Sequence, residues 1–397
     1  MCRVCKRIFA IGIIALLGTF ATLVGAQANK ERVLFNFRNG DGNSTYPSQL
    51  TLDKAGNLYG TTAYGGDFCC GCYSGCGTVF KLAPDGSMNV LYYFECDYYG
   101  GSGCYPYGGV VQDPATGYLY GTTAGGGAVY RGTVFRLAPD GTEHVMHLFE
   151  GSDGADPETR LLRDGNGGLF GTTYSGGDYY YYGTVFKIMQ DGSGFAVLHS
   201  FDGADGDEPR AHLKNDDAGN LYGVTTLGGT HDYGTVYEVM SDGTEMVLYS
   251  FSGGADGTYP IGGLAEDDFG NLYGTTYYGG STNCTSGCGV IFRLSPNGNF
   301  KVLYAFKGGH DGATPSAGLL KGRDGVFYGT TYEGGNGNGT VFAIAPDGYK
   351  TNIYRFLGSP DGAHPSSRLV EDRHRYLYGT TDQGGTYGEG TIFAVRE

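Results

Sequence analysis

The chain has 397 residues, of which 75 are glycine and 34 are tyrosine, and it contains no tryptophan. Charged residues make up 17% of the chain, and the net charge is −15 at pH 7. This composition excludes a charged disordered tail and a coiled coil, and the acidic balance disfavours binding to nucleic acid or to anionic lipid.

Residues 1–26 have the pattern of a secretory signal peptide. Three basic residues precede an apolar run at residues 8–24, and small residues follow it. We expect cleavage after Ala26 or Ala28 and a secreted product, either extracellular or periplasmic. The alternative is an uncleaved membrane anchor, but a run of about 17 residues is short for a span. No second apolar segment follows, so we expect no stable membrane span after signal removal.

From residue 31 to residue 397 the sequence repeats one pattern seven times. Each copy has an apolar and an aromatic residue before Gly-(Thr/Val)-Thr, then a Gly-Gly doublet, then Gly-(Thr/Val)-(Val/Ile)-(Phe/Tyr). The first marker glycines are Gly60, Gly121, Gly171, Gly223, Gly274, Gly329 and Gly379, and the second are Gly77, Gly132, Gly183, Gly234, Gly289, Gly339 and Gly390. A period of 50 to 61 residues built from strand-type segments predicts a repeat architecture.

Residues 259–306 illustrate one copy. A short strand ends at Glu266, and strands at 272–276, 289–294 and 302–306 follow, rich in β-branched and aromatic residues. Asp, Asn and Gly separate them as turn residues. Four antiparallel strands in a radial arrangement form a propeller blade.

The two ends of the chain predict how the ring closes. The last copy stops after its third strand, at residues 391–395, and residues 33–37 match 247–251, which is a fourth strand. We therefore expect an all-β fold with a single seven-bladed β-propeller at 31–397, in which the N-terminal strand completes the last blade. Closure removes exposed strand edges, and we expect a monomer.

The run Gly-Asn-Leu-Tyr-Gly-Thr-Thr, continued by Gly-Gly and Gly-Thr-Val-Phe-x-Leu-x-Pro-Asp-Gly, resembles the GloVer (Gloeobacter/Verrucomicrobia) tandem-repeat family. The clearest copies are at 56–86, 219–243 and 270–298. The resemblance implies an exported bacterial protein and supplies no activity or catalytic residues. Family members often carry a C-terminal anchor, which we do not expect here because the chain ends at Glu397 within the last blade.

Eight cysteines follow the predicted signal peptide, an even number that favours disulfides in an exported chain. They are Cys69, Cys70, Cys72, Cys76, Cys96, Cys104, Cys284 and Cys288. We expect Cys96 to pair with Cys104 and Cys284 with Cys288. The first four could form two bridges or a four-thiolate zinc site, but they lack the separated Cys-x-x-Cys pairs of such a site.

Strand alternation predicts that the variable loops and the crossings between blades share one face, whereas short Asp-Gly hairpins occupy the other. All eight cysteines lie in loops of the variable face, with the tyrosines Tyr130, Tyr179, Tyr180, Tyr181 and Tyr182. Variable loops on a rigid scaffold commonly bind ligands, and tyrosine offers a large amphipathic contact. We therefore expect a polysaccharide or protein ligand there; the alternative is that the tyrosines only cover neighbouring loops.

The innermost strands predict a second candidate site. The residues immediately before their apolar positions are Gln49, Gly109, Arg160, His212, Gly263, Gly318 and Arg368. Arg160, His212 and Arg368 could converge in the central channel on an anion such as a uronate carboxylate. The alternative is that they pair with the aspartates of the crossings.

The sequence favours a non-catalytic binding or scaffold protein and predicts no cofactor. The crossings repeat Asp-Gly-x-x-Pro, and the most acidic copy, with Asp202, Asp205, Asp207 and Glu208, makes calcium conceivable, although a repeated turn explains the motif as well. No other metal site is predicted. The alternatives are a carbohydrate-active lyase or hydrolase at the channel mouth, which needs suitably placed acids, and a structural envelope or matrix component.

Overall fold

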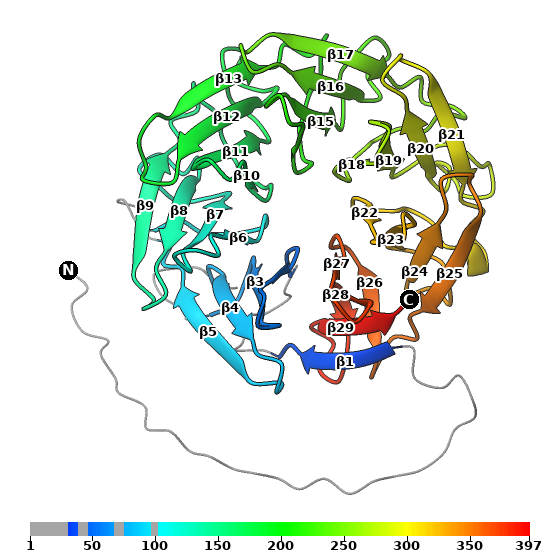
Figure 1. The fold of residues 1–397 in the computed structure, drawn as a ribbon, viewed down its shortest axis with the longest axis horizontal. Coiled ribbons are helices and arrows are strands. Elements are labelled where there is room, and N and C mark those ends of the chain that lie inside the picture. The colour runs from blue at the N-terminus through cyan, green and yellow to red at the C-terminus, as the bar shows by residue number, and fades with distance from the viewer. Residues whose placement is uncertain (1–30, 39–46, 67–74, 97–101) are drawn as a thin grey trace, which may run out of the picture.

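The computed structural model describes residues 31–38, 47–66, 75–96 and 102–397, and these form seven antiparallel sheets arranged radially around a central axis (Figure 1). The seven-bladed β-propeller predicted from the repeat is confirmed. The described residues contain one short 3-10 helix, η1 (Gly309–Asp311), and among them no helix has the length and apolar character that a membrane span requires. The predicted signal peptide lies outside the described residues.

Six blades have four strands each, numbered from the channel outwards. Blade 1 contains β2 (Thr51–Leu52), β3 (Leu58–Thr62), β4 (Thr78–Leu82) and β5 (Met88–Tyr93); blade 2 contains β6 (Val110–Gln112), β7 (Leu119–Thr123), β8 (Thr133–Leu137) and β9 (Glu143–Leu148); blade 3 contains β10 (Leu162–Arg163), β11 (Gly168–Thr173), β12 (Thr184–Met189) and β13 (Ala196–Ser200). Blade 4 contains β14 (Lys214–Asn215), β15 (Leu221–Thr225), β16 (Thr235–Val239) and β17 (Glu245–Ser250); blade 5 contains β18 (Ala265–Glu266), β19 (Leu272–Thr276), β20 (Val290–Leu294) and β21 (Phe300–Ala305); blade 6 contains β22 (Leu320–Lys321), β23 (Phe327–Thr331), β24 (Thr340–Ile344) and β25 (Lys350–Arg355).

The seventh blade joins the two ends of the chain. Its strands are β27 (Val370–Glu371), β28 (Tyr376–Gly384), β29 (Thr391–Arg396) and, outermost, β1 (Glu31–Asn36), while β26 (Gly362–Pro365) pairs with the far end of β28. The predicted closure is confirmed: β1 lies antiparallel to β29, with Glu31 opposite Val395. Figure 1 shows the blue N-terminal strand beside the red C-terminal one.

Each first marker glycine faces an aromatic ring across the sheet. The pairs are Gly60–Phe80, Gly121–Phe135, Gly171–Phe186, Gly223–Tyr237, Gly274–Phe292, Gly329–Phe342 and Gly379–Phe393. A Cβ at any of these glycines would lie 2.3–2.6 Å from the nearest atom of the aromatic side chain. Because non-bonded atoms do not approach each other this closely, only glycine lets the ring lie flat over the second strand.

The same rings join each blade to the one before it. A phenylalanine that follows the outermost strand packs edge-on against the ring of the next blade, with centroids 5.0–5.6 Å apart. Phe251 of blade 4, for example, contacts Phe292 of blade 5, and both side chains are fully buried. Edge-to-face pairs are favourable beyond the apolar area that they bury. The repeat pattern therefore encodes contacts between blades as well as strands within them.

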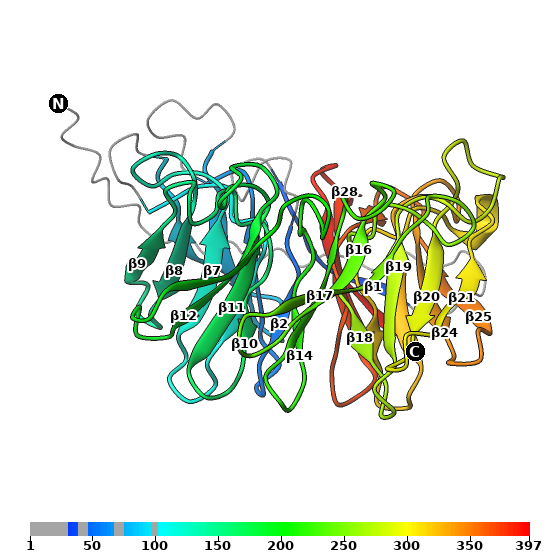
Figure 2. The same cartoon turned by 90° about the horizontal axis from the view of Figure 1, so that it is seen from above.

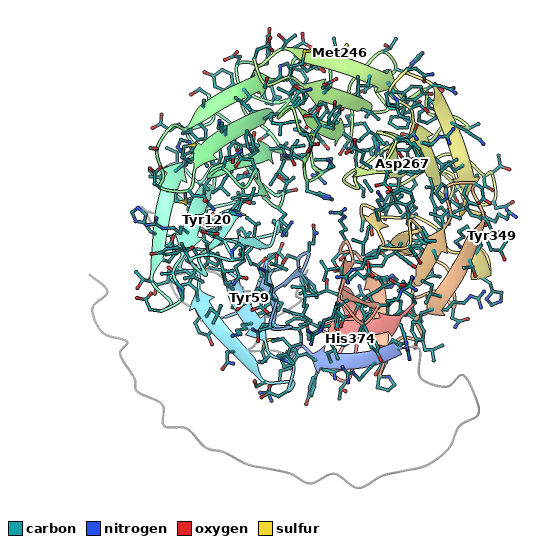
Figure 3. The ribbon with its side chains drawn as sticks, in the orientation of Figure 1. Tyr59, Tyr120, Met246, Asp267, Tyr349 and His374 are labelled. Atoms are coloured by element: carbon teal, nitrogen blue, oxygen red, sulfur yellow. A yellow bond between two sulfur atoms is a disulfide. The ribbon has the colours of Figure 1, made fainter. Side chains whose placement is uncertain are left out.

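Crossings and loops lie on one face of the ring, and short hairpins on the other (Figure 2). The hairpins have repeated hydrogen bonds. In one of them Asp267 (labelled in Figure 3) accepts hydrogen bonds from the backbone N–H of Asn271 at 2.9 Å and from the Tyr273 hydroxyl at 2.9 Å. Such turns explain the Asp-x-x-Gly-Asn-Leu-Tyr sequence without any ligand.

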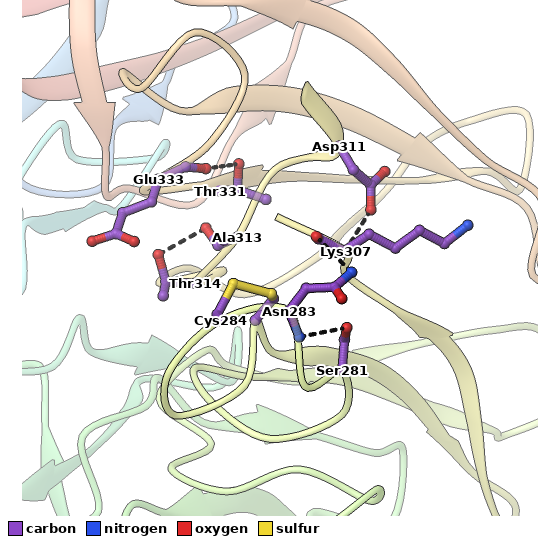
Figure 4. The surroundings of a disulfide bond; sticks show 10 residues. Ser281, Asn283, Cys284, Lys307, Asp311, Ala313, Thr314, Thr331 and Glu333 are labelled. Carbon is purple, nitrogen blue, oxygen red and sulfur yellow. Dashed lines mark hydrogen bonds between the residues drawn. A yellow bond between two sulfur atoms is a disulfide. The ribbon is translucent and has the colours of Figure 1, made fainter. Parts of the chain in front are cut away.

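The structure confirms one predicted disulfide and corrects another. Cys284 and Cys288 are bonded within the β19–β20 loop, where Asn283 Nδ2 also donates to the Lys307 carbonyl at 3.1 Å (Figure 4). The predicted Cys96–Cys104 pair is wrong, because Cys96 bonds to Cys76.

Strand pairing explains this correction. Cys76 precedes β4 and Cys96 follows β5, and because these two strands are hydrogen-bonded neighbours, their ends place the two Cα atoms 5.8 Å apart. That separation suits a disulfide. Cys104 is buried and lies opposite Gly125. Cys69, Cys70 and Cys72 lie outside the described residues.

The glycine–aromatic pair predicts a specific cost for adding one methyl group. We expect Gly274→Ala to lower the free energy of unfolding by about 1–3 kcal/mol, because the new Cβ would meet the Phe292 ring at 2.4 Å. Gly254→Ala is the matched control, since a Cβ there meets nothing within 4 Å. Denaturant unfolding measures both. Equal effects of the two substitutions would contradict the role assigned to the pair.

The closing blade predicts a pH dependence. Burial, then the neighbouring Asp361 carboxylate, raises the pKa of Glu31 on β1. The folded protein therefore holds the Glu31 proton more tightly than the unfolded chain, so this group's contribution to stability falls as the pH rises above the ordinary carboxyl range. We expect Glu31→Gln to stabilise the protein more at about pH 8 than at about pH 5. Thermal unfolding of both proteins at both pH values measures this; an equal difference at the two values would contradict it.

Candidate functional site

A cavity of about 220 Å³ lies in the central channel, bounded by residues from the start of the innermost strands. Arg160, His212 and Arg368 all line it, as the sequence predicted, together with Tyr107 and Glu158. These side chains come from blades 2, 3, 4 and 7. The ring closure therefore brings together residues that are up to about 260 positions apart in the sequence.

Arg160 is held by neighbouring blades and not by an acid. Its Nε donates to the Val110 carbonyl at 3.2 Å, and its Nη2 donates to the Thr51 hydroxyl at 3.0 Å. The guanidinium therefore extends around the channel across the inner strands of blades 2 and 1. Burial lowers its pKa to about 10, so the group stays charged at neutral pH.

Arg368 has the same kind of support from blade 6, since its Nε donates to the Leu319 carbonyl at 2.9 Å. Burial, and then the charge of Arg160, lowers its pKa to about 10. Within the described parts of the chain, no carboxylate lies within ion-pair distance of either guanidinium. The alternative that these arginines pair with the crossing aspartates is therefore wrong for the described residues.

His212 lies over the inner strands of the next two blades. A Cβ at Gly263 would lie 2.0 Å from its Cε1 atom, and one at Gly318 would lie 3.0 Å from it. Its Nε2 atom is buried and has no hydrogen-bond partner among the described residues. Burial first, and then the charges of Arg368 and Arg160, hold the pKa of His212 well below its usual range, so the ring is neutral at pH 7.

These contacts explain why the ring of channel residues breaks sevenfold symmetry. Glycine at 263 and 318 leaves the space that His212 occupies. The His212 side chain can thus extend over blades 5 and 6 only because both blades have glycine at the matching position. The sequence showed the four polar and three glycine positions, but the fit between them follows from ring closure.

The mouth of the channel on the loop face has a second group of polar side chains. Arg210 stacks 4.1 Å from the centre of the Tyr174 ring and lies 3.9 Å from Glu158 and 3.7 Å from Glu208. Tyr107 shares a hydrogen bond of 2.7 Å with the hydroxyl of Tyr64. The mouth is therefore lined by tyrosine rings and by one arginine that has acidic neighbours.

Six residues at the crossings have a positive φ that residues with side chains rarely adopt, and sequence analysis missed them. They are Tyr105, Asp156, Glu208, Tyr259, Thr314 and His364, with φ of 52–61°. Each precedes a proline. Asp156 shows the reason: its N–H bonds to the Arg131 carbonyl of the previous blade, and its carbonyl accepts from Tyr174 of its own blade. The backbone strain is thus offset by bonds that join the blades.

The predicted tyrosine site does not join the channel. Tyr179, Tyr180 and Tyr181 are 54%, 68% and 75% exposed on the β11–β12 loop, and Tyr130 is 40% exposed on the β7–β8 loop. None of them lines the cavity. Tyr182 differs from its neighbours, because it packs against the core between blades 3 and 4. Three of the four consecutive tyrosines are therefore exposed to solvent, and the fourth, Tyr182, packs against the core.

The crossing aspartates act mainly as turn residues. Asp256 accepts from the backbone N–H of Ser252 at 2.8 Å and from the Tyr249 hydroxyl at 3.0 Å. Asp202 and Asp205 likewise bond within their own turn. These contacts favour the turn interpretation over a calcium loop.

A larger cavity, of about 860 Å³, opens on the hairpin face between blades 7 and 1. Its aspartates already serve the turns: Asp53 accepts from Asn57, Asp85 from Ser87, and Asp372 from Tyr376. Its remaining acid, Glu371, lies 3.9 Å from Arg323. The channel, where Arg160 and Arg368 have no acid partner among the described residues, is therefore the better candidate site.

Solved structures resemble the chain in fold alone, at identities of 12–14%. An extracellular domain assigned to a one-component system of B. thetaiotaomicron has a TM-score of 0.56 at 14% identity, over 91% of this chain and 40% of that one. An oligogalacturonate lyase in complex with manganese has a TM-score of 0.52 at 13% identity, over 91% and 98%. The Vibrio parahaemolyticus oligogalacturonate lyase has a TM-score of 0.54 at 12% identity, over 92% and 93%.

This chain thus spans 40% of the length of the first of these proteins. No curated protein matches the sequence. The Gloeobacter/Verrucomicrobia repeat matches residues 47–286 and 281–397. Because these matches extend over the seven-bladed ring from its first inner strand to its last residue, the chain belongs to the Gloeobacter/Verrucomicrobia repeat family.

Proposed function

We propose that this protein is a secreted, non-catalytic binding protein whose central channel receives a carboxylate of an acidic polysaccharide from the loop face. One observation carries the proposal: Arg160 and Arg368 line a channel cavity without any carboxylate partner among the described residues, beside a buried and unbonded His212 Nε2. Two charged guanidinium groups with free donors match the geometry of a carboxylate.

Electrostatics supports an anionic ligand. Bringing two like charges into a channel is unfavourable when nothing neutralises them. The whole chain is acidic, with a net charge of −15, yet among the described residues the cavity lining holds three arginines and a single carboxylate, Glu158. A ligand carboxylate would compensate the arginines and would accept a hydrogen bond from a protonated His212.

Aromatic side chains at the mouth support a saccharide. Tyr107 lines the cavity, and Tyr174 forms the platform on which Arg210 stacks. Aromatic rings give apolar contact to the faces of sugar rings, and their hydroxyls bond to sugar hydroxyls. The exposed Tyr179, Tyr180 and Tyr181 offer a further surface on the same face for an extended polymer.

The lining supports binding over hydrolysis. Glycoside hydrolysis uses a pair of carboxyl groups that flank the scissile bond, whereas Glu158 is the one carboxylate among the described residues that line this cavity. The Glu158 carboxylate also lies within ion-pair distance of Arg210.

The proposal predicts that the channel arginines control affinity for uronate polymers. We expect Arg160→Gln and Arg368→Gln each to weaken binding of polygalacturonate about 10- to 100-fold, because each removes a charge-assisted contact. Lys301→Gln, which removes an exposed positive charge on β21, is the control and should change little. Calorimetric titration with polygalacturonate, alginate and an uncharged glucan measures these affinities.

Three other results would each contradict one part of the proposal. Binding lost in a Tyr179→Ser/Tyr180→Ser/Tyr181→Ser variant but kept in both arginine variants would place the site on the loop surface. Unsaturated products appearing during incubation with the polymer would show a lyase. Equal binding of the uncharged glucan would exclude a carboxylate as the recognised group.

His212 predicts the direction of the pH effect. A bound carboxylate favours the charged imidazolium, so the pKa of His212 should be higher in the complex than in the free protein. Binding then takes up a proton, and affinity should rise as the pH falls from about 8 to about 5, where uronates remain ionised. His212→Gln should remove this dependence. A pH-independent affinity of the unmodified protein would contradict the role given to His212.

A further inference from the structure

The outermost strands of neighbouring blades meet in seams, and in the five seams from blades 2–3 to blades 6–7 three side chains lie together. One comes from near the end of an outermost strand, one is the aspartate of the crossing that follows, and one begins the outermost strand of the next blade. In the seam between blades 5 and 6, these are Tyr304, Asp311 and Lys350. The outermost strands of these blades pair in one register, so their side chains can be compared position by position, although the crossing is one residue shorter after His147 and His199 than after Tyr304.

The seam between blades 5 and 6 shows that this place accepts a cation. The Lys350 ammonium lies 2.9 Å from Asp311 Oδ1 and 5.5 Å from the centre of the Tyr304 ring. Its side chain is only 2% exposed. The crossing aspartate of a seam can therefore hold a positive charge in a partly enclosed site.

The seam between blades 3 and 4 has the same strand register, a crossing that is one residue shorter, and a different set of side chains. His199 takes the place of Tyr304, Asp205 that of Asp311, and Glu245 that of Lys350. His199 Nε2 lies 2.8 Å from Asp205 Oδ2, and one ligand atom from each of the three residues lies within 4.8 Å of the others. The position of the lysine cation is thus occupied by a third potential metal ligand.

Glu245 forms no ion pair with an arginine or lysine among the described residues. Its Oε1 is buried and has no hydrogen-bond partner in the described parts of the chain. Burial first, and then the Asp205 charge, raises the pKa of Glu245 to about 7. A divalent cation between the two carboxylates would remove this repulsion.

We propose that His199, Asp205 and Glu245 bind a divalent transition-metal ion, zinc by the chemistry of its ligands, which fastens blade 3 to blade 4 on the outside of the ring. One imidazole nitrogen and two carboxylate oxygens are ligands that zinc accepts, with water completing the coordination. Calcium fits less well because it takes oxygen ligands. This site is separate from the channel, and its test does not depend on the proposed polysaccharide.

Neighbouring seams supply matched controls. His147 bonds to Asp153 at 2.8 Å as His199 does to Asp205, but Phe195 stacks on its ring at 3.5 Å and offers no ligand. Glu143 has the position of Glu245 and a buried Oε1 without a partner, but it faces Tyr92, which is not a histidine. The first control seam therefore lacks the glutamate, and the second lacks the histidine and has Ser102 in place of the crossing aspartate.

Cobalt titration of the chelator-stripped full chain, followed by absorbance, tests the proposal. We expect one equivalent to bind with ligand-field bands and without a thiolate-to-cobalt band, and zinc to displace it. Glu245→Gln and His199→Gln should each weaken binding at least about tenfold, whereas Glu143→Gln and His147→Gln should not.

Thermal unfolding gives an independent readout. Glu245→Gln removes a buried charge, so we expect the metal-free variant to be at least as stable as the unmodified protein, and zinc to raise the Tm of the unmodified protein alone. Failure of cobalt to bind, or binding that persists in both Glu245→Gln and His199→Gln, would overturn the proposal. A thiolate band would place the metal at cysteines.

Discussion

The contact between a glycine of the second strand and an aromatic ring of the third is the constraint on which the whole ring depends. With no Cβ at Gly274, the Phe292 ring lies over the second strand and leaves its edge open to Phe251 of the previous blade. Replacing the glycine would displace the ring and so disturb the joint between the two blades. Because the same arrangement recurs in all seven blades, the ring closes without a continuous central core.

This scaffold has two regions where side chains can vary between blades: the central channel and the outer circumference of the ring. At the channel, the innermost strands are only two or three residues long, and their first polar positions face residues from several blades. At the circumference, each seam combines residues of two blades with a crossing. Side chains at the circumference contact the buried rings, as Phe300 contacts Phe292 and Lys350 contacts Phe342. The strand pairing is nevertheless the same in these blades, so chemistry can differ between them.

The sequence predicted most of the fold because its information is local and repeated. Strands, hairpins and the complementary strand at the N-terminus follow from patterns within about ten residues, and the polar channel ring follows from its position before each inner strand. The predicted partner of Cys96 was wrong because spacing favours Cys104, which is nearer in the sequence. The pairing of β4 with β5 instead places Cys76 next to Cys96 in space.

The seam of His199, Asp205 and Glu245 was missed for a related reason. Asp205 was noticed only as part of an acidic turn, since the other two side chains come from a neighbouring strand and from the next blade. The positive φ of residues such as Asp156 also has no composition signal, because several residue types share it. In each case the missing information is which strands become neighbours in space.

Charge and size together restrict what the channel can admit. An acidic surface repels a polyanion over roughly a Debye length, about 8 Å at physiological salt, whereas the arginines act only on groups that have already entered. The side of a densely charged polymer would bring many carboxylates against that surface for each one that reached Arg160 and Arg368. A cavity of about 220 Å³ has room for about one sugar residue with its carboxylate. For the acidic polysaccharide that we propose as the ligand, this geometry favours binding of the end of the chain, or of a short oligomer, over binding of its middle.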